Sequence, residues 1–157
     1  MSKAARILII DDDKSIRRSL TSILEEKGYA VDTARNADEA LRKSKDAYYN
    51  LALIDIRLPD LEGTDLLNKL QETSPEMIKI ILTGYPSLQN AIKAVNRGAD
   101  GYLIKPADID ELHQMIEEHL KRQEEEKKYS EEKVAEFIKW RAKELRHASR
   151  KHQSPKK

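Results

Sequence analysis

The sequence predicts an α/β fold, a (βα)5 arrangement in which five parallel strands form one doubly wound, flavodoxin-like sheet followed by a C-terminal helical extension. Three observations support this. Short apolar runs recur along the first two thirds of the chain, as expected for strands covered on both faces. Segments with a helical apolar period separate these runs, and this alternation favours a parallel sheet with right-handed crossovers. The final segment has no such runs and is highly charged.

Five segments are predicted as strands. Four are short apolar runs and one is more polar; in chain order they are Ile7–Ile10, the more polar Tyr29–Thr33, Leu51–Ile54, Ile78–Leu82 and Tyr102–Ile104. The chain has one Trp and one Phe, so its core must consist mainly of Ile, Leu, Val and Ala. That composition suits a sheet with helices on both faces.

Five helices are predicted between and after these strands. Ile16, Leu20 and Leu24 keep a period of 3.6 residues, and Gly28 follows as a typical C-terminal glycine. Three later helices begin at residues whose side chains can accept a hydrogen bond from a free N–H group: Asn36, Ser87 and Asp108. The remaining helix is marked by the apolar residues Leu66, Leu67 and Leu70.

Composition excludes several classes of protein. The chain has no cysteine, which rules out disulfides, thiolate catalysis and cysteine-ligated zinc. No apolar run approaches the roughly 18 residues of a membrane span, and Met1–Arg6 leads directly into the first strand, so we expect a cytoplasmic protein without membrane insertion. No zinc site is expected among the four histidines, which we interpret as surface or tail residues: His113, His119, His147 and His152.

Polar residues follow four of the five predicted strands. They are Asp11, Asp12 and Asp13 after the first strand, Asp55 after the third, Thr83 after the fourth and Lys105 after the fifth. The carboxyl ends of parallel strands lie at one edge of the sheet, where ligands of such folds bind. Each residue alone is more often an ordinary solvated loop residue. Their joint occurrence at four strand ends favours a shared site.

The chemistry of this set suits a phosphoryl group. The carboxylates of Asp11, Asp12 and Asp55 repel one another unless a cation lies among them, and Mg²⁺ prefers a few carboxylates together with water and phosphate oxygens. Lys105 offers a positive charge and Thr83 a hydroxyl donor for phosphate. We therefore predict a phosphoryl group on Asp55, with the metal and the lysine neutralising its charge.

Four motifs resemble the receiver domain of two-component response regulators. They are "ILIIDDD", "LALIDIRLPDLEG", "ILTG" and "GYLIKP", which occur in the family's order with 22 residues from Thr83 to Lys105. The resemblance covers about residues 5–122 and leaves 123–157 as a charged helical extension with a basic end. It implies that a sensor histidine kinase transfers a phosphoryl group to Asp55.

The resemblance also implies roles for the surrounding residues. Asp11, Asp12, Asp55 and the main-chain carbonyl of Arg57 would bind Mg²⁺, whereas Asp13 falls outside this set and is interpreted as solvated. In the same way, three residues would respond to phosphorylation: Thr83 would move toward the phosphoryl group, Lys105 would pair with it, and Tyr102 would change rotamer. The alternative for Tyr102 is that it serves only in packing.

Loop positions match the family as well. Gly63 is expected where the backbone needs a freedom that other residues lack. Gly84 matches a small residue beside the pocket, and Pro59 lies in the loop after Asp55. By resemblance, the peptide bond between Lys105 and Pro106 is expected to be cis.

The predicted function is a phosphorylation-dependent signalling switch and not an enzyme. It would report through the face formed by the fourth helix, the fifth strand and the fifth helix, and this face or the tail could support a homodimer. A Mg²⁺-dependent phosphohydrolase with an aspartyl nucleophile is a rival. It usually needs an acidic residue two positions after the nucleophile, where this chain has Arg57.

The tail differs in charge from the rest. Residues 1–120 carry 16 basic and 21 acidic residues, a net charge of −5, whereas residues 121–157 carry 13 and 7, a net charge of +6. The fifth helix can continue through 121–129 as a solvated rod, and Ser130 can then cap a new helix. A narrow stripe with a spacing of three or four residues follows, formed by Val134, Phe137, Ile138, Arg141 and Leu145. It must dock on the receiver, on a second copy or on a partner protein. Because residues 139–157 are basic, nucleic acid is a possible partner, but a solvated helix end is favoured and no helix-turn-helix pattern is present.

Overall fold

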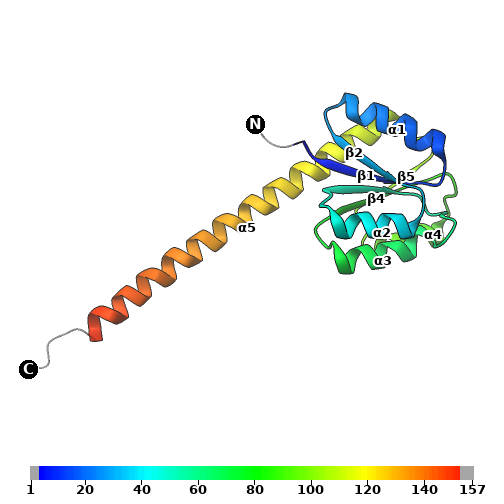
Figure 1. Cartoon of the computed structure of the whole chain (residues 1–157). Helices are drawn as coiled ribbons and strands as arrows, with labels where there is room; N and C mark the ends of the chain where they lie inside the picture. The colour runs from blue at the N-terminus through cyan, green and yellow to red at the C-terminus, as the bar shows by residue number, and fades with distance from the viewer. Residues whose placement is uncertain (1–3, 153–157) are drawn as a thin grey trace, which may run out of the picture. The chain divides into compact units, whose positions relative to one another are not determined.

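The computed structural model describes residues 4–152 of the chain (Figure 1). Strands and helices alternate in the predicted order, and their bounds are β1 Arg6–Ile10, α1 Lys14–Glu26, β2 Ala30–Ala34, α2 Ala37–Asp46, β3 Leu51–Ile54, α3 Gly63–Thr73, β4 Ile78–Thr83, α4 Leu88–Asn96, β5 Gly101–Ile104 and α5 Ile109–His152. The strands form one parallel sheet with the order β2-β1-β3-β4-β5. The predicted (βα)5 fold is therefore confirmed.

The sheet has a separate hydrophobic core on each face. One core contains side chains from α2, α3 and α4, and the other contains side chains from α1 and the beginning of α5. Figure 1 shows α2, α3 and α4 on the side of the sheet opposite α1. This is the doubly wound arrangement that the alternating pattern predicts.

The side chains of β1 show why its apolar run is continuous. Ile7 and Ile9 pack into the core with α1 and α5, whereas Leu8 and Ile10 pack into the core with α2 and α3. Successive side chains of a strand point to opposite faces, so a strand covered on both sides needs an apolar residue at every position. These four side chains are at most 1% exposed.

β4 contains one buried charged residue among its apolar side chains. Lys79 is 1% exposed, and its Nζ donates hydrogen bonds to Gln71 Oε1 at 2.9 Å and to the carbonyl of Met77 at 2.8 Å. Burial lowers the pKa of the Lys79 ammonium, although the charge of Asp100 opposes this. The charge is tolerated because the N–H groups have buried acceptors.

The helix ends follow the predicted capping chemistry. The side chains of Asn36 and Ser87 accept hydrogen bonds from N–H groups three residues on, and Asp108 accepts from the N–H groups of the first turn of α5. Gly28 and Gly98 follow α1 and α4 with φ values of +97°, a conformation that side chains with a Cβ rarely adopt.

Asp13 corrects the interpretation of the aspartate run. It is exposed, as expected of a solvated residue, but it is also the N-cap of α1. Its Oδ1 accepts hydrogen bonds from the N–H groups of Ser15 and Ile16. Asp13 therefore caps the start of α1. The run of three aspartates did not reveal this role.

α5 is one continuous helix of 44 residues, and the expectation of a new helix at Ser130 is wrong. The segment 121–129 contains neither Gly nor Pro and is rich in Glu, Lys and Arg, which are strong helix formers. The chain nevertheless divides into two compact units between Leu120 and Lys121. Among the described residues, no helix is both long and apolar enough to cross a membrane.

Candidate functional site

The predicted site residues lie at the carboxyl ends of neighbouring strands. Asp11 and Asp55 follow β1 and β3, which are adjacent in the sheet. The strand order reverses direction between these two strands, and such a switch point is where ligands of open α/β sheets bind. Thr83 is the last residue of β4, and Lys105 follows β5.

Three carboxylates form an acidic cluster at this edge. One oxygen each from Asp11, Asp12 and Asp55 lies within 4.8 Å of the others. Asp11 and Asp55 are buried, whereas Asp12 is exposed. Burial raises the pKa of Asp11 and the nearby charge of Asp55 adds to this, although hydrogen bonds from Lys105 and the Asp13 N–H oppose the change. The donor set fits a hard divalent cation.

Lys105 connects two of these carboxylates. Its Nζ donates hydrogen bonds to Asp11 Oδ2 at 2.5 Å and to Asp55 Oδ2 at 3.1 Å. Burial lowers the pKa of this ammonium, but the bonds and charges of the two carboxylates outweigh burial and raise it. A positive charge is thus held next to Asp55. The Lys105–Pro106 peptide bond is cis, as expected.

Thr83 lies on β4, next to β3, and Tyr102 lies on β5 at the edge of the sheet. Thr83 is buried, and its Oγ1 accepts a hydrogen bond from the N–H of Tyr85 at 3.1 Å. The ring of Tyr102 packs against the core that contains α2, α3 and α4. Its hydroxyl is buried and has no hydrogen-bond partner among the described residues. A buried hydroxyl without a partner is costly, so this position of Tyr102 has a free-energy penalty.

The loop between β3 and α3 passes very close to Asp55. The N–H of Gly63 donates to the carbonyl of Ile56 at 2.7 Å, and a Cβ at Gly63 would lie 2.2 Å from the carbonyl oxygen of Asp55. The glycine is therefore required by lack of space. Its φ is not positive, so the expectation that it supplies a special backbone conformation is wrong.

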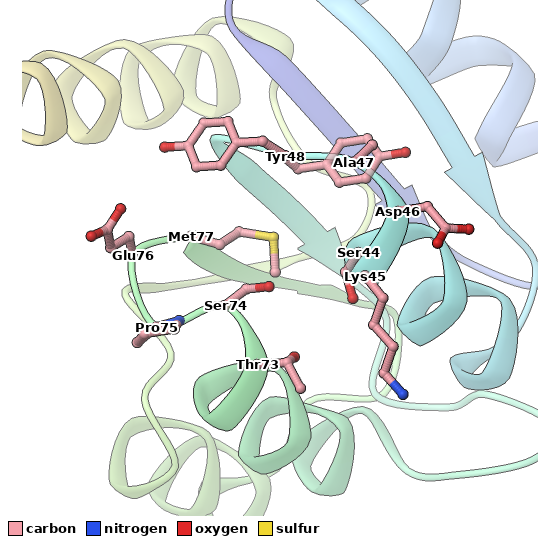
Figure 2. Close-up of a pocket in the computed structure, with 11 residues that line it drawn as sticks. Ser44, Lys45, Asp46, Ala47, Tyr48, Thr73, Ser74, Pro75, Glu76 and Met77 are labelled. Carbon is pink, nitrogen blue, oxygen red and sulfur yellow. The ribbon is translucent and has the colours of Figure 1, made fainter.

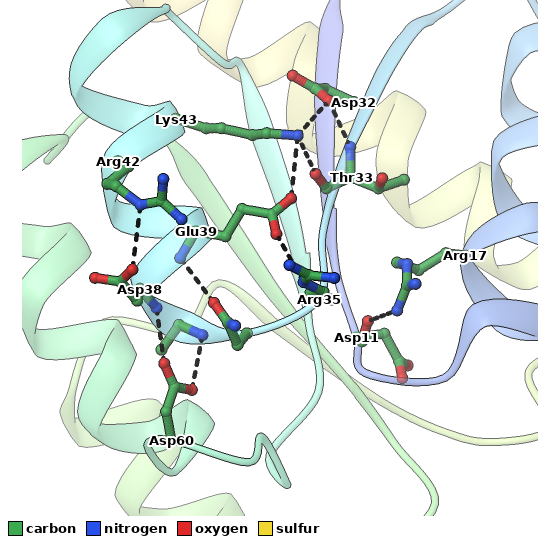
Figure 3. Close-up of polar contacts among 12 residues, drawn as sticks. Asp11, Arg17, Asp32, Thr33, Arg35, Asp38, Glu39, Arg42, Lys43 and Asp60 are labelled. Carbon is green, nitrogen blue, oxygen red and sulfur yellow. Dashed lines mark hydrogen bonds and ion pairs between the residues drawn. The ribbon is translucent and has the colours of Figure 1, made fainter.

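Asp60 connects the same loop to α2, a contact that the sequence analysis missed. Its two carboxylate oxygens accept hydrogen bonds from the N–H groups of Ala37 and Asp38, each at 2.9 Å (Figure 3). Burial raises the pKa of Asp60, but the backbone N–H groups outweigh it and the pKa is lowered. The capping partner is 23 residues away in sequence, so no local pattern predicts it.

A second contact fixes the loop after β1. The guanidinium of Arg17 on α1 donates a hydrogen bond to the carbonyl oxygen of Asp11 at 2.7 Å (Figure 3). The main chain that carries Asp11 and Asp12 is thereby connected to the first helix. The acidic cluster is held by contacts from helices on both faces of the sheet.

Two large side chains stack beside the cluster. The guanidinium carbon of Arg57 lies 3.7 Å from the centre of the Tyr85 ring, within the range of a cation–π contact. The Arg57 N–H donates to Asp55 Oδ1 at 3.3 Å, so this residue also contacts the phosphoacceptor candidate through its main chain. Tyr85 is 53% exposed.

One pocket of the first unit lies away from these residues. A pocket of about 430 Å³ is formed by the segments 44–49 and 73–77, at the ends of α2 and α3 (Figure 2). These segments precede β3 and β4, so the pocket lies at the amino ends of the strands. The acidic cluster lies at the opposite edge. Pocket size is therefore not the feature that marks the site.

Comparison with known proteins agrees with the geometry. Residues 7–117 match the model of the response regulator receiver domain, which is most of the chain. This chain belongs to the response regulator receiver family. It is 37% identical over 114 residues to the transcriptional regulatory protein ZraR of Klebsiella oxytoca, a match that covers 73% of this chain and 26% of ZraR. The chain thus spans about a quarter of that relative.

Solved structures of receivers are also similar. The receiver domain protein of Methanospirillum hungatei has a TM-score of 0.77 and 48% identity, and the match covers 78% of this chain and 98% of that one. The response regulator TrrA of Thermotoga maritima, solved in complex with Mg²⁺ and BeF, has a TM-score of 0.68 and 32% identity, with coverages of 73% and 98%. Both likenesses extend over the part of the chain that contains the acidic cluster.

The bond between Asp60 and α2 makes a prediction about stability. Asp60→Ala should lower the free energy of unfolding by about 1 kcal/mol at pH 7, because two N–H groups at a helix start lose their acceptor. The folded-state pKa of Asp60 lies below 3.8, so its contribution is present above that pH and is lost as the pH falls through the folded value. Urea unfolding at pH 7 and pH 2.5 measures both effects.

The matched control is Glu72→Ala, which removes an exposed carboxylate from α3. It should change the free energy of unfolding little at either pH. An Asp60→Ala effect that is as large at pH 2.5 as at pH 7 would show that the carboxylate charge does not contribute to capping.

Proposed function

We propose that this receiver is a phosphorylation-dependent signalling switch that accepts a phosphoryl group on Asp55 from a sensor histidine kinase. The observation that carries the proposal is the position of Asp55, buried next to two further carboxylates and hydrogen-bonded to Lys105. A carboxylate is a weak nucleophile, and it needs neighbouring positive charge to accept a phosphoryl group. Lys105 supplies part of that charge.

We further propose that Asp11, Asp12, Asp55 and the main-chain carbonyl of Arg57 hold Mg²⁺. When bound, the cation would neutralise the charge of the phosphoryl oxygens. The acidic cluster supports this assignment because its carboxylate oxygens approach within 4.8 Å. The raised pKa of Asp11 supports it too, since a carboxylate that resists ionisation beside Asp55 gains from a cation.

The change on phosphorylation would involve Thr83 and Tyr102. In this proposal the Thr83 hydroxyl leaves the Tyr85 N–H and moves to the phosphoryl group, and Tyr102 changes rotamer. The missing partner of the Tyr102 hydroxyl supports the second step, because another rotamer can satisfy it.

The output surface would be the face formed by α4, β5 and the beginning of α5. Four large apolar side chains of α4 and β5 are more than half exposed there: Leu88, Ile92, Val95 and Ile104. Exposed apolar side chains gathered on neighbouring elements are typical of a protein-binding surface. A downstream protein or a second receiver would bind to it, and we place this activity in the cytoplasm with the kinase.

The arrangement does not favour the rival phosphohydrolase. Such an enzyme needs a general acid two residues after the nucleophile, and this chain has Arg57, whose guanidinium stacks on Tyr85. We therefore propose that the protein catalyses only its own phosphorylation and dephosphorylation. No contact of the described tail residues favours DNA as its target.

Asp55→Asn tests the phosphoacceptor. This variant should keep the fold, since the side chains are nearly isosteric, and should lose all labelling by acetyl phosphate or by a cognate kinase. Circular dichroism and radiolabel incorporation measure the two outcomes. Asp46→Asn, at the end of α2, is the control and should label like the wild type. An alkali-labile, stoichiometric label in Asp55→Asn would exclude Asp55 from this role.

Asp12→Ala tests the metal. It should abolish Mg²⁺-dependent labelling and raise the melting temperature measured without Mg²⁺, because one of three repelling carboxylates is removed. The neighbouring variant Asp13→Asn is the control, because asparagine caps a helix as well as aspartate does. If Asp13→Asn reduced the Mg²⁺ dependence as strongly as Asp12→Ala, the assignment of the metal ligands would be wrong.

The stack of Arg57 on Tyr85 makes a prediction about lifetime. By resemblance, these positions border the path of water to the phosphoryl group, and the two large side chains should hinder attack. The aspartyl phosphate should therefore outlive those of the fastest chemotaxis-type receivers, and Arg57→Ala/Tyr85→Ala should lose phosphate several-fold faster than the wild type. The control is Tyr48→Ala, which removes a similarly exposed ring at the opposite edge. Equal decay rates in all three proteins would contradict the shielding.

A further inference from the structure

The second compact unit, which begins at Lys121, presents an unusual amount of apolar surface. Six large apolar side chains of this part of α5 are each between 54% and 61% exposed: Tyr129, Val134, Phe137, Ile138, Trp140 and Leu145. A helix with a broad apolar side is stable in water only when that side is covered. Within the described residues, nothing in the second unit covers it.

The apolar residues share one side of the helix. At about 100° per residue they occupy roughly half of the circumference, and the other half is charged. The charged side consists of Glu131, Glu132, Glu136, Lys139, Lys143 and Arg146. Along the apolar side, alternating steps of four and three residues connect Val134, Ile138, Arg141, Leu145 and Ala148. This is the spacing of a coiled-coil seam.

Charge varies along the same segment. Residues 130–139 contain three acidic and two basic residues, a net charge of −1, whereas residues 140–149 contain one acidic and three basic residues, a net charge of +2. A second copy in antiparallel orientation would bring the acidic half of each helix next to the basic half of the other. A parallel copy would place like charges together.

The seam residues also favour the antiparallel orientation. In a parallel pair Glu131 would face Glu131, and Arg141 would face Arg141, at buried positions. When Val134 faces Leu145 of an antiparallel copy, Arg141 instead faces Ile138 and Glu131 faces Ala148. The long stem of Arg141 can then lie along the apolar surface while its guanidinium reaches water.

We propose that residues 130–149 pair with the same segment of a second copy as an antiparallel two-stranded coiled coil. The acidic half of the segment decides between this occupant and an anionic surface. Membranes and nucleic acids attract only the basic half and repel the three acidic residues of 130–139. A second copy places each half beside the opposite charge and covers Val134, Ile138 and Leu145.

The oligomeric state of the full chain without a phosphodonor is the first test. Sedimentation equilibrium should show dimers, and Ile138→Gln/Leu145→Gln should raise the dissociation constant at least tenfold. The matched control Lys139→Gln/Lys143→Gln changes the charged side and should weaken the dimer less. Glutamine forms helices well, so the helix remains. Circular dichroism and acetyl phosphate labelling check that both variants keep their fold and their activity.

The distance between spin labels tests the relative orientation of the two helices. The chain has no cysteine, so Ser130→Cys accepts a single spin label, and Ser130 is exposed. In the antiparallel register two labelled positions should lie about 29 Å apart along the axis, against about 10 Å in a parallel pair. A mixture of Ser130→Cys and Ser149→Cys should give a short distance between the two labels, since these positions face each other.

Several outcomes would overturn the proposal. A chain that stays monomeric at every concentration, a dimer that both variants leave unchanged, or a short distance between two labels at Ser130 would each do so. So would a monomer that binds vesicles of anionic phospholipid or duplex DNA through the tail, since the segment would then have a different occupant.

Discussion

The pairing of Lys105 with Asp11 and Asp55 is the interaction on which the acidic edge of the sheet depends. Three carboxylate oxygens within 4.8 Å repel one another, and burial of two of the aspartates strengthens the repulsion. The ammonium of Lys105 offsets part of this, because the two carboxylates raise its pKa and its hydrogen bond opposes the rise that burial causes in the pKa of Asp11. Any cation or phosphoryl group that binds must redistribute these contacts. The balance of charge around Lys105 therefore changes when a cation or a phosphoryl group binds.

Two constraints hold the loop between β3 and α3 beside Asp55. Gly63 leaves no space for a side chain beside the Asp55 carbonyl, and Asp60 holds the loop to the start of α2. Close packing fixes one end of the loop, and hydrogen bonds fix the other. Arg57, between them, keeps its N–H on Asp55 and its guanidinium on Tyr85. The loop is thus rigid where it supports Asp55.

Sequence patterns predicted two kinds of feature: the strands, which depend on local residue order, and the site residues that lie at strand ends. The apolar runs predicted four of the five strands, because burial on both faces demands consecutive apolar residues, and the fifth, β2, was predicted from a more polar segment. The parallel sheet then brings Asp11, Asp55 and Lys105 together. Local sequence patterns did not predict the hydrogen bond between Asp60 and α2, because the two partners are 23 residues apart. These patterns also failed at Ser130, where a good capping residue lies inside a helix. Capping signals decide a boundary only when the preceding residues cannot continue the helix.

The two lysines of β4 and β5 show why residue type alone does not identify a site. Lys79 and Lys105 both follow or interrupt apolar runs, and both have Nζ hydrogen bonds inside the protein. The partners of Lys79 are neutral oxygens, so burial dominates and its pKa is lowered. The partners of Lys105 are carboxylates, so its pKa is raised. Since Lys79 lies near the amino end of its strand and Lys105 at the carboxyl end, the direction of the parallel sheet decides which lysine meets the acidic cluster.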